Sequence, residues 1–361
     1  MRPDRAGAFR PRAAQAPGRS GPHRSSKTAD FRKGETVPPT KESKRDRPGA
    51  AEGGRPRGTP QRLGDRVFSG ASTGAGVLIL VILAGVAAFL IAEAWPALWA
   101  DSEDVTGGDG IVLYVWPVLF GTLISATFAL VIATPLAVAI ALFISHYAPR
   151  RVASLLGYVI DLLAAVPSII FGLWGVAELA PMTVGPTEWL ADNLGFIPLF
   201  DGPASATGRT MLVAIIVLAV MILPIATAVI REAFLQTPRL HEEASLALGA
   251  TRWEMIRMAV LPFGRSAIIG GSMLGLGRAL GETMAVAIVL SANRDIVSFD
   301  LISSANSSTI AANIALSFPE SSGLDVNTLI ASGLVLFAVT LLVNMGARAV
   351  INRRREFSGA N

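Results

Sequence analysis

The chain has 361 residues, of which 52% are hydrophobic and only 16% are charged, whereas a soluble domain carries about 25% charged residues. It has no cysteine and three scattered histidines, which excludes a disulfide framework, thiolate catalysis and a cysteine- or histidine-rich metal site. The net charge of +4 comes mainly from the first 66 residues and therefore does not indicate a nucleic-acid-binding domain.

Residues 1–66 are rich in Arg, Pro, Gly and Ser and contain few large apolar side chains. Such a segment cannot bury enough apolar surface to offset the entropy of ordering it, so we predict a disordered basic tail. It lacks the apolar core of a cleaved signal peptide. Its charge either acts as a topology signal or contacts anionic lipid headgroups. Because Met182 is the first methionine after Met1, translation could instead start at a non-Met codon near Val67.

Residues 67–358 form the predicted transmembrane domain, because they contain six apolar segments long enough to cross about 30 Å of hydrocarbon. We therefore expect an all-α membrane protein with six transmembrane helices. Pro135 in the second segment and Pro167 in the third predict kinks or breaks. Residues 309–318 are apolar but too few to span, which favours a short surface helix or a re-entrant segment. The expected spans are residues 67–92, a part of 110–145, 152–179, 210–230, 263–292 and 326–347.

Arginine is unevenly distributed among the predicted loops. The loops after the second and fourth spans and the C-terminal segment are basic, whereas the other loops are mainly acidic. Tryptophans flank the first acidic loop, as side chains at a membrane interface do: Trp95, Trp99 and Trp116. By the positive-inside rule, both termini and the basic tail are predicted to be cytoplasmic.

The loop between the fourth and fifth spans is the only sizeable loop predicted on the cytoplasmic side, and its sequence is typical of two short helices. Thr237 can cap the first helix, and Gly249 suits its left-handed end. Thr251 and Glu254 have the spacing of a capping box at the start of the second. Pro262 is expected to end that helix. The pattern predicts a rigid bracket exposed to a cytoplasmic partner.

This loop, about residues 237–262, also resembles the EAA loop of ABC-importer permeases. Ser245 stands in place of the second alanine of that signature, and Ala259 stands at its isoleucine position. The resemblance implies a coupling helix that docks in a groove of an ATP-hydrolysing subunit, whereas an ordinary helical hairpin loop is the alternative. The residues that carry the match are Glu243, Ala244, Ser245, Gly249, Leu261 and Pro262.

Three further strings, residues 166–173, 249–254 and 273–286, resemble permeases of the phosphate-specific transport system, PstC type. The resemblance covers about residues 65–358 and implies a type I ABC importer permease fold in the bacterial inner membrane. It also implies a homologous second permease (PstA-type), two ATPase subunits that bind ATP and Mg, and an extracytoplasmic phosphate-binding protein. No cofactor and no chemical reaction are then expected in this chain.

Two alternatives to phosphate import by an ABC permease stay open. Molybdate and sulfate permeases carry a related Arg-Ala-x-Gly-Glu string, so another oxyanion is possible. An ATP-independent secondary transporter or channel would instead show inverted repeats or paired broken helices. The coupling-type loop argues against that second alternative.

Arg278 and Glu282 lie near the middle of the fifth apolar segment, where a charge costs about 2.5–3.5 kcal/mol. Their spacing predicts a shared helix face. The Arg278 guanidinium can bind two oxygens of an oxyanion, and Glu282 would hold Arg278 or keep the anion from binding too tightly; the resemblance implies a transport role for both. A structural ion pair is the alternative, with Asp161 as a second partner of Arg278. Ser168, after Pro167, could expose backbone to the path, or the proline could simply kink the helix.

Glycines recur at small-xxx-small spacing in the fifth segment, in the pairs Gly271 with Gly275 and Gly277 with Gly281. This spacing predicts close helix packing. The same glycines lie in an apolar span, with no preceding strand and no Gly-Lys-Ser/Thr, so they do not form a nucleotide-binding loop. ATP is therefore expected to bind another chain.

Overall fold

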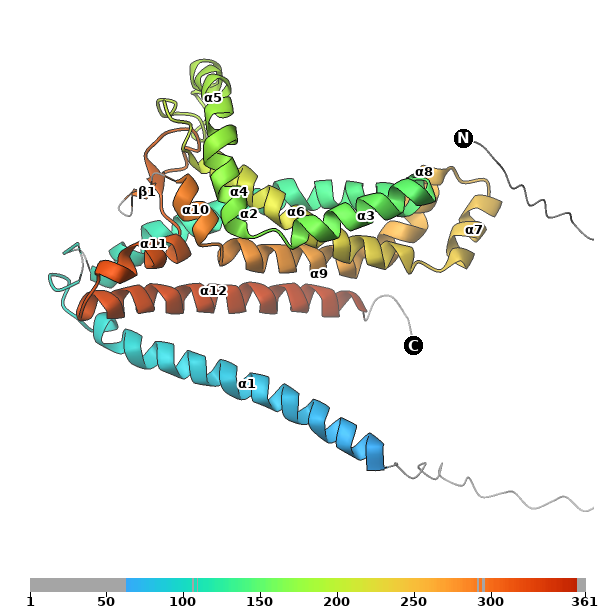
Figure 1. Ribbon diagram of the computed structural model, residues 1–361, viewed down its shortest axis with the longest axis horizontal. Helices are drawn as coiled ribbons and strands as arrows, with labels where there is room; N and C mark the ends of the chain where they lie inside the picture. The colour runs from blue at the N-terminus through green and yellow to red at the C-terminus, as the bar shows by residue number, and fades with distance from the viewer. Residues whose placement is uncertain (1–62, 106, 109, 291, 294–295, 356–361) are drawn as a thin grey trace, which may run out of the picture. The chain divides into compact units, whose positions relative to one another are not determined.

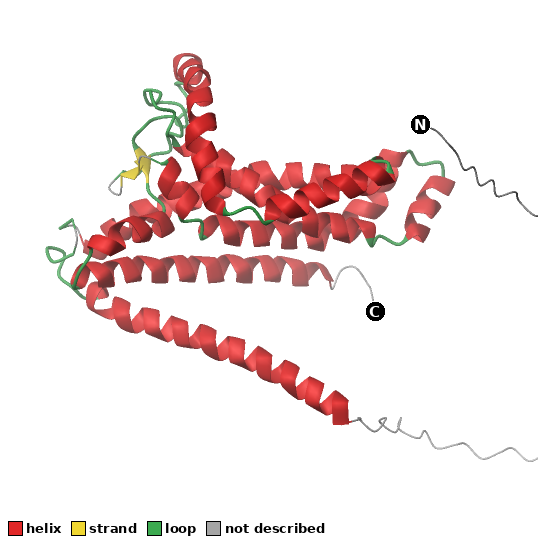
Figure 2. Ribbon diagram, in the orientation of Figure 1, coloured by secondary structure: helices red, strands yellow, loops and turns green. Residues whose placement is uncertain are grey.

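The computed structural model describes residues 63–105, 107–108, 110–290, 292–293 and 296–355. Residues 1–62 lie outside the described residues, so most of the basic tail stays a prediction. Residues 63–66, which were predicted to be disordered, instead form the start of the helix Leu63–Leu98. The described part is almost entirely helical (Figure 2). It also contains one small parallel sheet, in which β1 (Ala292–Asn293) pairs with β2 (Asn306–Ser307).

The helical segments follow one another in a chain of long spans and short connecting helices (Figure 1). Three of the short segments, η1, η2 and η3, are π-helical, and η4 is a 3₁₀-helix. In order they are α1 (Leu63–Leu98), α2 (Gly110–Leu142), η1 (Phe143–Tyr147), α3 (Arg150–Ala164), α4 (Ser168–Trp174), η2 (Gly175–Leu179), α5 (Ala180–Leu194), α6 (Met211–Leu235), α7 (Arg239–Ala247), α8 (Arg252–Met255), η3 (Ile256–Val260), α9 (Leu261–Leu280), α10 (Met284–Val289), α11 (Ile310–Ser317), η4 (Phe318–Glu320) and α12 (Leu324–Arg355).

Six helices of the described part are long and apolar enough to cross a membrane, which confirms the predicted number. The second runs through Pro135 without a break. The predicted short helix within residues 309–318 is also present, as α11, which Thr309 caps by accepting the amide proton of Ala312. The six candidate spans are Val67–Leu98, Gly110–Tyr147, Ser168–Leu194, Met211–Leu235, Arg252–Leu280 and Leu324–Val350.

The core is built around α6, which packs against α2 and α9 (Figure 1). Its apolar side chains, such as Leu218 and Ile222, are almost completely buried. Gly275 of α9 faces Ile222 so closely that a Cβ at this position would collide with that side chain. The predicted packing role of Gly275 is confirmed. Gly277, in contrast, has no atom within 4 Å of the position of a Cβ and therefore does not pack a neighbouring helix.

The third span does not run where the sequence pattern placed it, over residues 152–179. The helix α3 ends at Ala164, and Pro167 precedes the first residue of α4. Proline lacks an amide proton and disfavours helical backbone at the residue before it, so the chain breaks here. The candidate span is the continuous path from α4 through α5, while α3 is a separate helix that packs on α6.

The fifth apolar segment is also broken, because α9 ends at Leu280 and α10 begins only at Met284. The short α10 packs against α4, with Gly172 facing the backbone of Ala285. At its other end, Arg209 donates hydrogen bonds to the carbonyls of α10's last turn, at 2.7 Å to Ile288 and 3.2 Å to Val289. The two helix breaks therefore meet in one contact between α4 and α10.

Candidate functional site

A cavity of about 680 Å³ lies between α6, α9 and α12. Its wall is largely apolar but carries three polar side chains: Arg278 from α9, and Asn344 and Arg348 from α12. The Nε of Arg278 is buried and has no hydrogen-bond partner within the described part of the chain. An apolar cavity with a few converging donors and two positive charges fits an anion. The remaining lining residues are Ile225, Gly270, Met273, Leu274, Gly277 and Ala347.

Glu282 is buried, with 7% of its surface exposed, but it does not share a helix face with Arg278. The predicted face is wrong because α9 ends at Leu280, and the chain turns at Gly281. The Glu282 carboxylate instead accepts the amide proton of Ala285 at 3.1 Å. It therefore occupies the first turn of α10, where a helix presents unpaired amide protons and favours negative charge.

Asp161 does not pair with Arg278, contrary to the alternative that the sequence suggested. Its carboxylate lies 3.9 Å from Arg231 Nη2, across the contact between α3 and α6. The side chain of Asp161 is 56% exposed, and such a pair contributes little stability. Ser168 is the first residue of α4 and does not line the Arg278 cavity. The structure thus groups neither Asp161 nor Ser168 with Arg278.

The coupling loop has the predicted pair of short helices, α7 and α8. Gly249 adopts φ +86°, the left-handed conformation expected at the end of α7. Thr251 and Glu254 form the predicted capping box. Thr237 does not cap α7, because Pro238 occupies the N-cap position and makes no side-chain bond. Pro262 does not end the second helix either, since a proline is tolerated in the first turn of α9, where it lies.

The residues of the EAA-like signature mostly face outward. Glu243 and Ala244 of α7 are exposed, while Ser245 is half-buried and donates a hydrogen bond to the His241 carbonyl of its own helix at 2.8 Å. Leu248, at the end of α7, is 90% exposed. Leu261, which is half-buried, begins α9 directly behind the loop. A short helix with exposed apolar side chains at the end of a membrane bundle is suited to contact another subunit.

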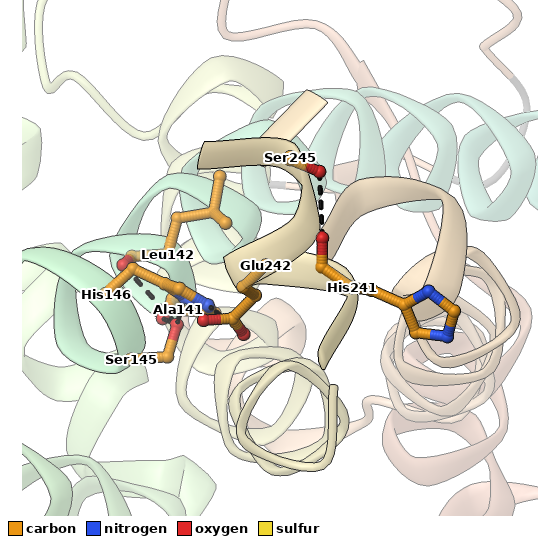
Figure 3. A network of polar contacts seen from close by, with 7 residues as sticks. All are labelled: Ala141, Leu142, Ser145, His146, His241, Glu242 and Ser245. Atoms are coloured by element: carbon orange, nitrogen blue, oxygen red, sulfur yellow. Dashed lines mark hydrogen bonds and ion pairs between the residues drawn. The ribbon is translucent and has the colours of Figure 1, made fainter. Parts of the chain in front are cut away.

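A polar contact ties this loop to the second span (Figure 3). Glu242 of α7 places its Oε1 3.5 Å from Nε2 of His146, which lies in η1 at the end of α2. The other ring nitrogen of His146 is 2.6 Å from the Ser145 hydroxyl. His241, the neighbour of Glu242, points away from this contact (Figure 3).

Sequence reasoning missed three of these residues. In the sequence, Arg348 contributes only to the basic C-terminal segment that predicts membrane orientation, and nothing about Asn344 indicates a functional role. Helical spacing does place both on one face of α12, four residues apart, but nothing in the sequence indicated that this face meets Arg278. His146 lies about a hundred residues before Glu242 in the chain, so only the fold brings the two together.

Comparison with known proteins places this architecture in a family. Residues 133–356 match the family described as the binding-protein-dependent transport system inner membrane component. The phosphate transport system permease protein PstC 2 of Mycobacterium tuberculosis is 45% identical over 302 residues, which cover 81% of this chain and 93% of that protein. PstC of Mycobacterium leprae is 43% identical over 80% of this chain and 94% of its own length. PstC of Mesorhizobium japonicum is 37% identical over 82% and 93%, respectively.

The fold has counterparts among solved structures. A bacterial ABC transporter involved in the import of the acidic polysaccharide alginate aligns with a TM-score of 0.53 at 17% identity. The alignment covers 81% of this chain and 99% of that chain, and it supports the fold alone. The family match and the sequence relatives show that the chain belongs to the inner-membrane permease family of binding-protein-dependent ABC importers, among the PstC-type phosphate transport permeases.

Proposed function

We propose that this chain forms half of the transmembrane path of an ATP-driven phosphate importer, with Arg278 contacting the anion. The observation that carries the proposal is the buried Arg278 Nε, which has no partner within the described residues, at a cavity that Arg348 also lines. A guanidinium binds tetrahedral oxyanions through two parallel hydrogen bonds. Relatives 35–45% identical to this chain are named phosphate transport system permeases.

Glu282 has a supporting role in this proposal. Its carboxylate accepts the amide proton of Ala285 at the start of α10, a donor that would otherwise attract the passing anion. The anion is then held by arginine alone and is released more readily. Asp161 and Ser168 do not line this cavity, since the first lies beside Arg231 and the second begins α4.

The partners follow from the coupling loop and the family. A homologous second permease would complete the path, and a binding protein would deliver phosphate at the outer face. Two ATPase subunits would bind ATP and Mg and receive α7 with its exposed Glu243 and Ala244. By the positive-inside rule, the basic loops support a bacterial inner-membrane location with both termini on the cytoplasmic side. This chain itself supplies half of the path and the coupling helix α7, and it contributes no catalytic group.

Phosphate uptake by Arg278 variants tests the proposal. Cells would carry Arg278→Ala, Arg278→Lys or the control Arg265→Ala, which removes an exposed arginine from the same helix. Uptake of labelled phosphate should fall at least about tenfold in Arg278→Ala, because one charge-assisted contact is worth about 1.5–3 kcal/mol. Arg278→Lys should retain part of it, and the control should match wild type. Full uptake by Arg278→Ala at equal membrane abundance would refute the assigned site.

Two competing functions have different outcomes in the same cells. If sulfate or molybdate is the substrate, either anion should compete with labelled phosphate at equal concentration. If the chain is a secondary transporter, as its two broken spans would allow, uptake should persist when the ATPase partner is inactivated. Loss of uptake on ATPase inactivation supports the importer.

A further inference from the structure

The coupling helix α7 has very little to hold it against the rest of the chain. None of its residues is buried. Its apolar side chains Leu240 and Leu248 are 75% and 90% exposed. Within the described ranges, the Glu242–His146 contact is the one ion pair recorded between α7 and another element. Besides the packing of α7 on α8 and η3 within its own loop, this contact is therefore the polar link between α7 and the second span.

The hydrogen-bond chain around His146 fixes which ring nitrogen faces Glu242. Ser145 Oγ lies 2.7 Å from the Ala141 carbonyl and 2.6 Å from His146 Nδ1. If the hydroxyl donates to Nδ1, the neutral ring carries its proton on Nε2. If the hydroxyl instead donates to the Ala141 carbonyl, Nδ1 must donate to the Ser145 oxygen. Nε2, which lies 3.5 Å from the Glu242 carboxylate, then carries a proton only when the ring is an imidazolium. In the first case an N–H at Nε2 points to Glu242, and in the second case it does so only when both ring nitrogens carry a proton.

His146 is also well placed to transmit a movement. It lies in the π-helical turn η1, where the helical spacing widens at the end of α2; such turns are frequent at functional sites. Its side chain is only 10% exposed, whereas that of Glu242 is 24% exposed. The η1 turn packs against α3 and α6 as well as α2, and α2 packs along α6 and α9. A displacement of α7 that pulls on His146 is therefore passed to the core helices.

We propose that His146 is a positioning residue that fastens the coupling helix to the second span through Glu242, so that movement of α7 is converted into movement of the path. The inference rests on the proposed function, because it assumes that an ATPase moves α7. It assigns a second transmission route, since α7 is already connected to α9 through α8 and η3 by the chain itself.

The surroundings of the contact define the competing partners. A small cavity of about 280 Å³ beside it is lined by Tyr147, Arg252, Leu246, Met255 and Ile256, besides Ser145, His146 and Glu242. Arg252, from α8, also faces this cavity and carries a positive charge. Removal of His146 leaves Glu242 free to turn toward Arg252, which belongs to the coupling loop itself. The link between α7 and the second span is then lost, although the charge of Glu242 is still balanced by Arg252 within the loop.

The experiment uses the complete complex in proteoliposomes and measures phosphate imported per ATP hydrolysed. The variants are His146→Ala, Glu242→Ala, the double variant, and His146→Gln, whose amide nitrogen can donate from about the place of Nε2. His241→Ala is the matched control, because this neighbouring histidine is exposed and points away from the contact (Figure 3). Retention of the ATPase on purification is measured for each.

We expect both single alanine variants to lower the phosphate-to-ATP ratio at least about 5-fold, the lower limit of ordinary coupling between sites. The double variant should be no worse than either single one, His146→Gln should recover part of the ratio, and His241→Ala should match wild type. Additive losses in the double variant, or an unchanged ratio in His146→Ala, would overturn the proposal. So would loss of the ATPase subunits, which would show that the contact only holds the complex together.

A cross-linking measurement covers the case in which the alanine variants fail to assemble. The chain has no native cysteine, so His146→Cys with Glu242→Cys can be joined by a short bismaleimide without side reactions in this subunit. Because the proposed link persists through the cycle, the joined complex should keep ATP-dependent uptake; arrest by the cross-link would overturn it. A wild-type complex that imports no phosphate with ATP would instead refute the proposed function.

Discussion

The contact between α4 and α10 gives a sharp test of the packing, because Gly172 of α4 lies directly against the backbone of Ala285 in α10. A Cβ on Gly172 would lie 2.8 Å from the Cα of Ala285. Carbon atoms pack at about 3.5–4.0 Å, so Gly172→Ala requires α4 and α10 to separate by roughly 1 Å. The obstructing atom is backbone and cannot rotate away.

Overpacking of this kind costs about 1–3 kcal/mol, and we expect Gly172→Ala near the upper end. Gly185→Ala is the matched control, since this glycine belongs to the same span and has no atom within 4 Å of a Cβ position. It should be neutral or slightly stabilising, because alanine favours a helix over glycine by up to about 1 kcal/mol.

The assay is the unfolding free energy of the purified chain in detergent, followed by circular dichroism, together with phosphate uptake. The obstructing atom is the Cα of Ala285, so Ala285→Gly should not rescue Gly172→Ala. Equal unfolding free energies for Gly172→Ala and Gly185→Ala would refute the reasoning, as would full rescue by Ala285→Gly.

Three further outcomes are expected. Arg348→Ala should lower phosphate uptake without a loss of thermal stability, because its side chain is exposed, lines the cavity and makes no hydrogen bond or ion pair with the described residues; uptake equal to wild type would remove it from the path. Arg209→Ala should destabilise the fold by about 2 kcal/mol, since it frees the carbonyls at the end of α10, and chemical denaturation with Arg209→Lys as a partial replacement measures this. Thr251→Ala should loosen the start of α8 by about 1 kcal/mol, seen as faster hydrogen exchange there but not in α9; unchanged exchange would contradict the capping role.

The number of spans and the position of the coupling helices were predictable, because apolar length and capping residues are local properties. Gly249 and the Thr251–Glu254 box act within a few residues of themselves, and the structure has both. The break at Pro167 was signalled as well, but hydropathy alone could not show that the span resumes beyond it, since residues on both sides are apolar.

The candidate site was predictable only in part. Arg278 was identifiable because a charge in an apolar segment is energetically costly and is therefore usually present for a functional reason. Its relation to Glu282 was misjudged, because the four-residue spacing assumes a continuous helix and Gly281 ends it. The pair of Asp161 with Arg231, and the position of Arg278 and Arg348 at one cavity, both depend on segments that are distant in the sequence. Such pairings depend on how whole helices pack together, and this packing cannot be read from local patterns in a single sequence.

The exposure of α1 makes the lipid bilayer itself part of the structure. Its most apolar stretch has no buried residue, and it meets the rest of the chain near its end, where Ala94 and Ala97 pack on Ala331. The candidate span Val67–Leu98 has 32 residues, about 48 Å at 1.5 Å per residue, which exceeds the roughly 30 Å of hydrocarbon. The helix must tilt or project beyond the membrane, so its angle, and with it the position of its free end, will follow bilayer thickness.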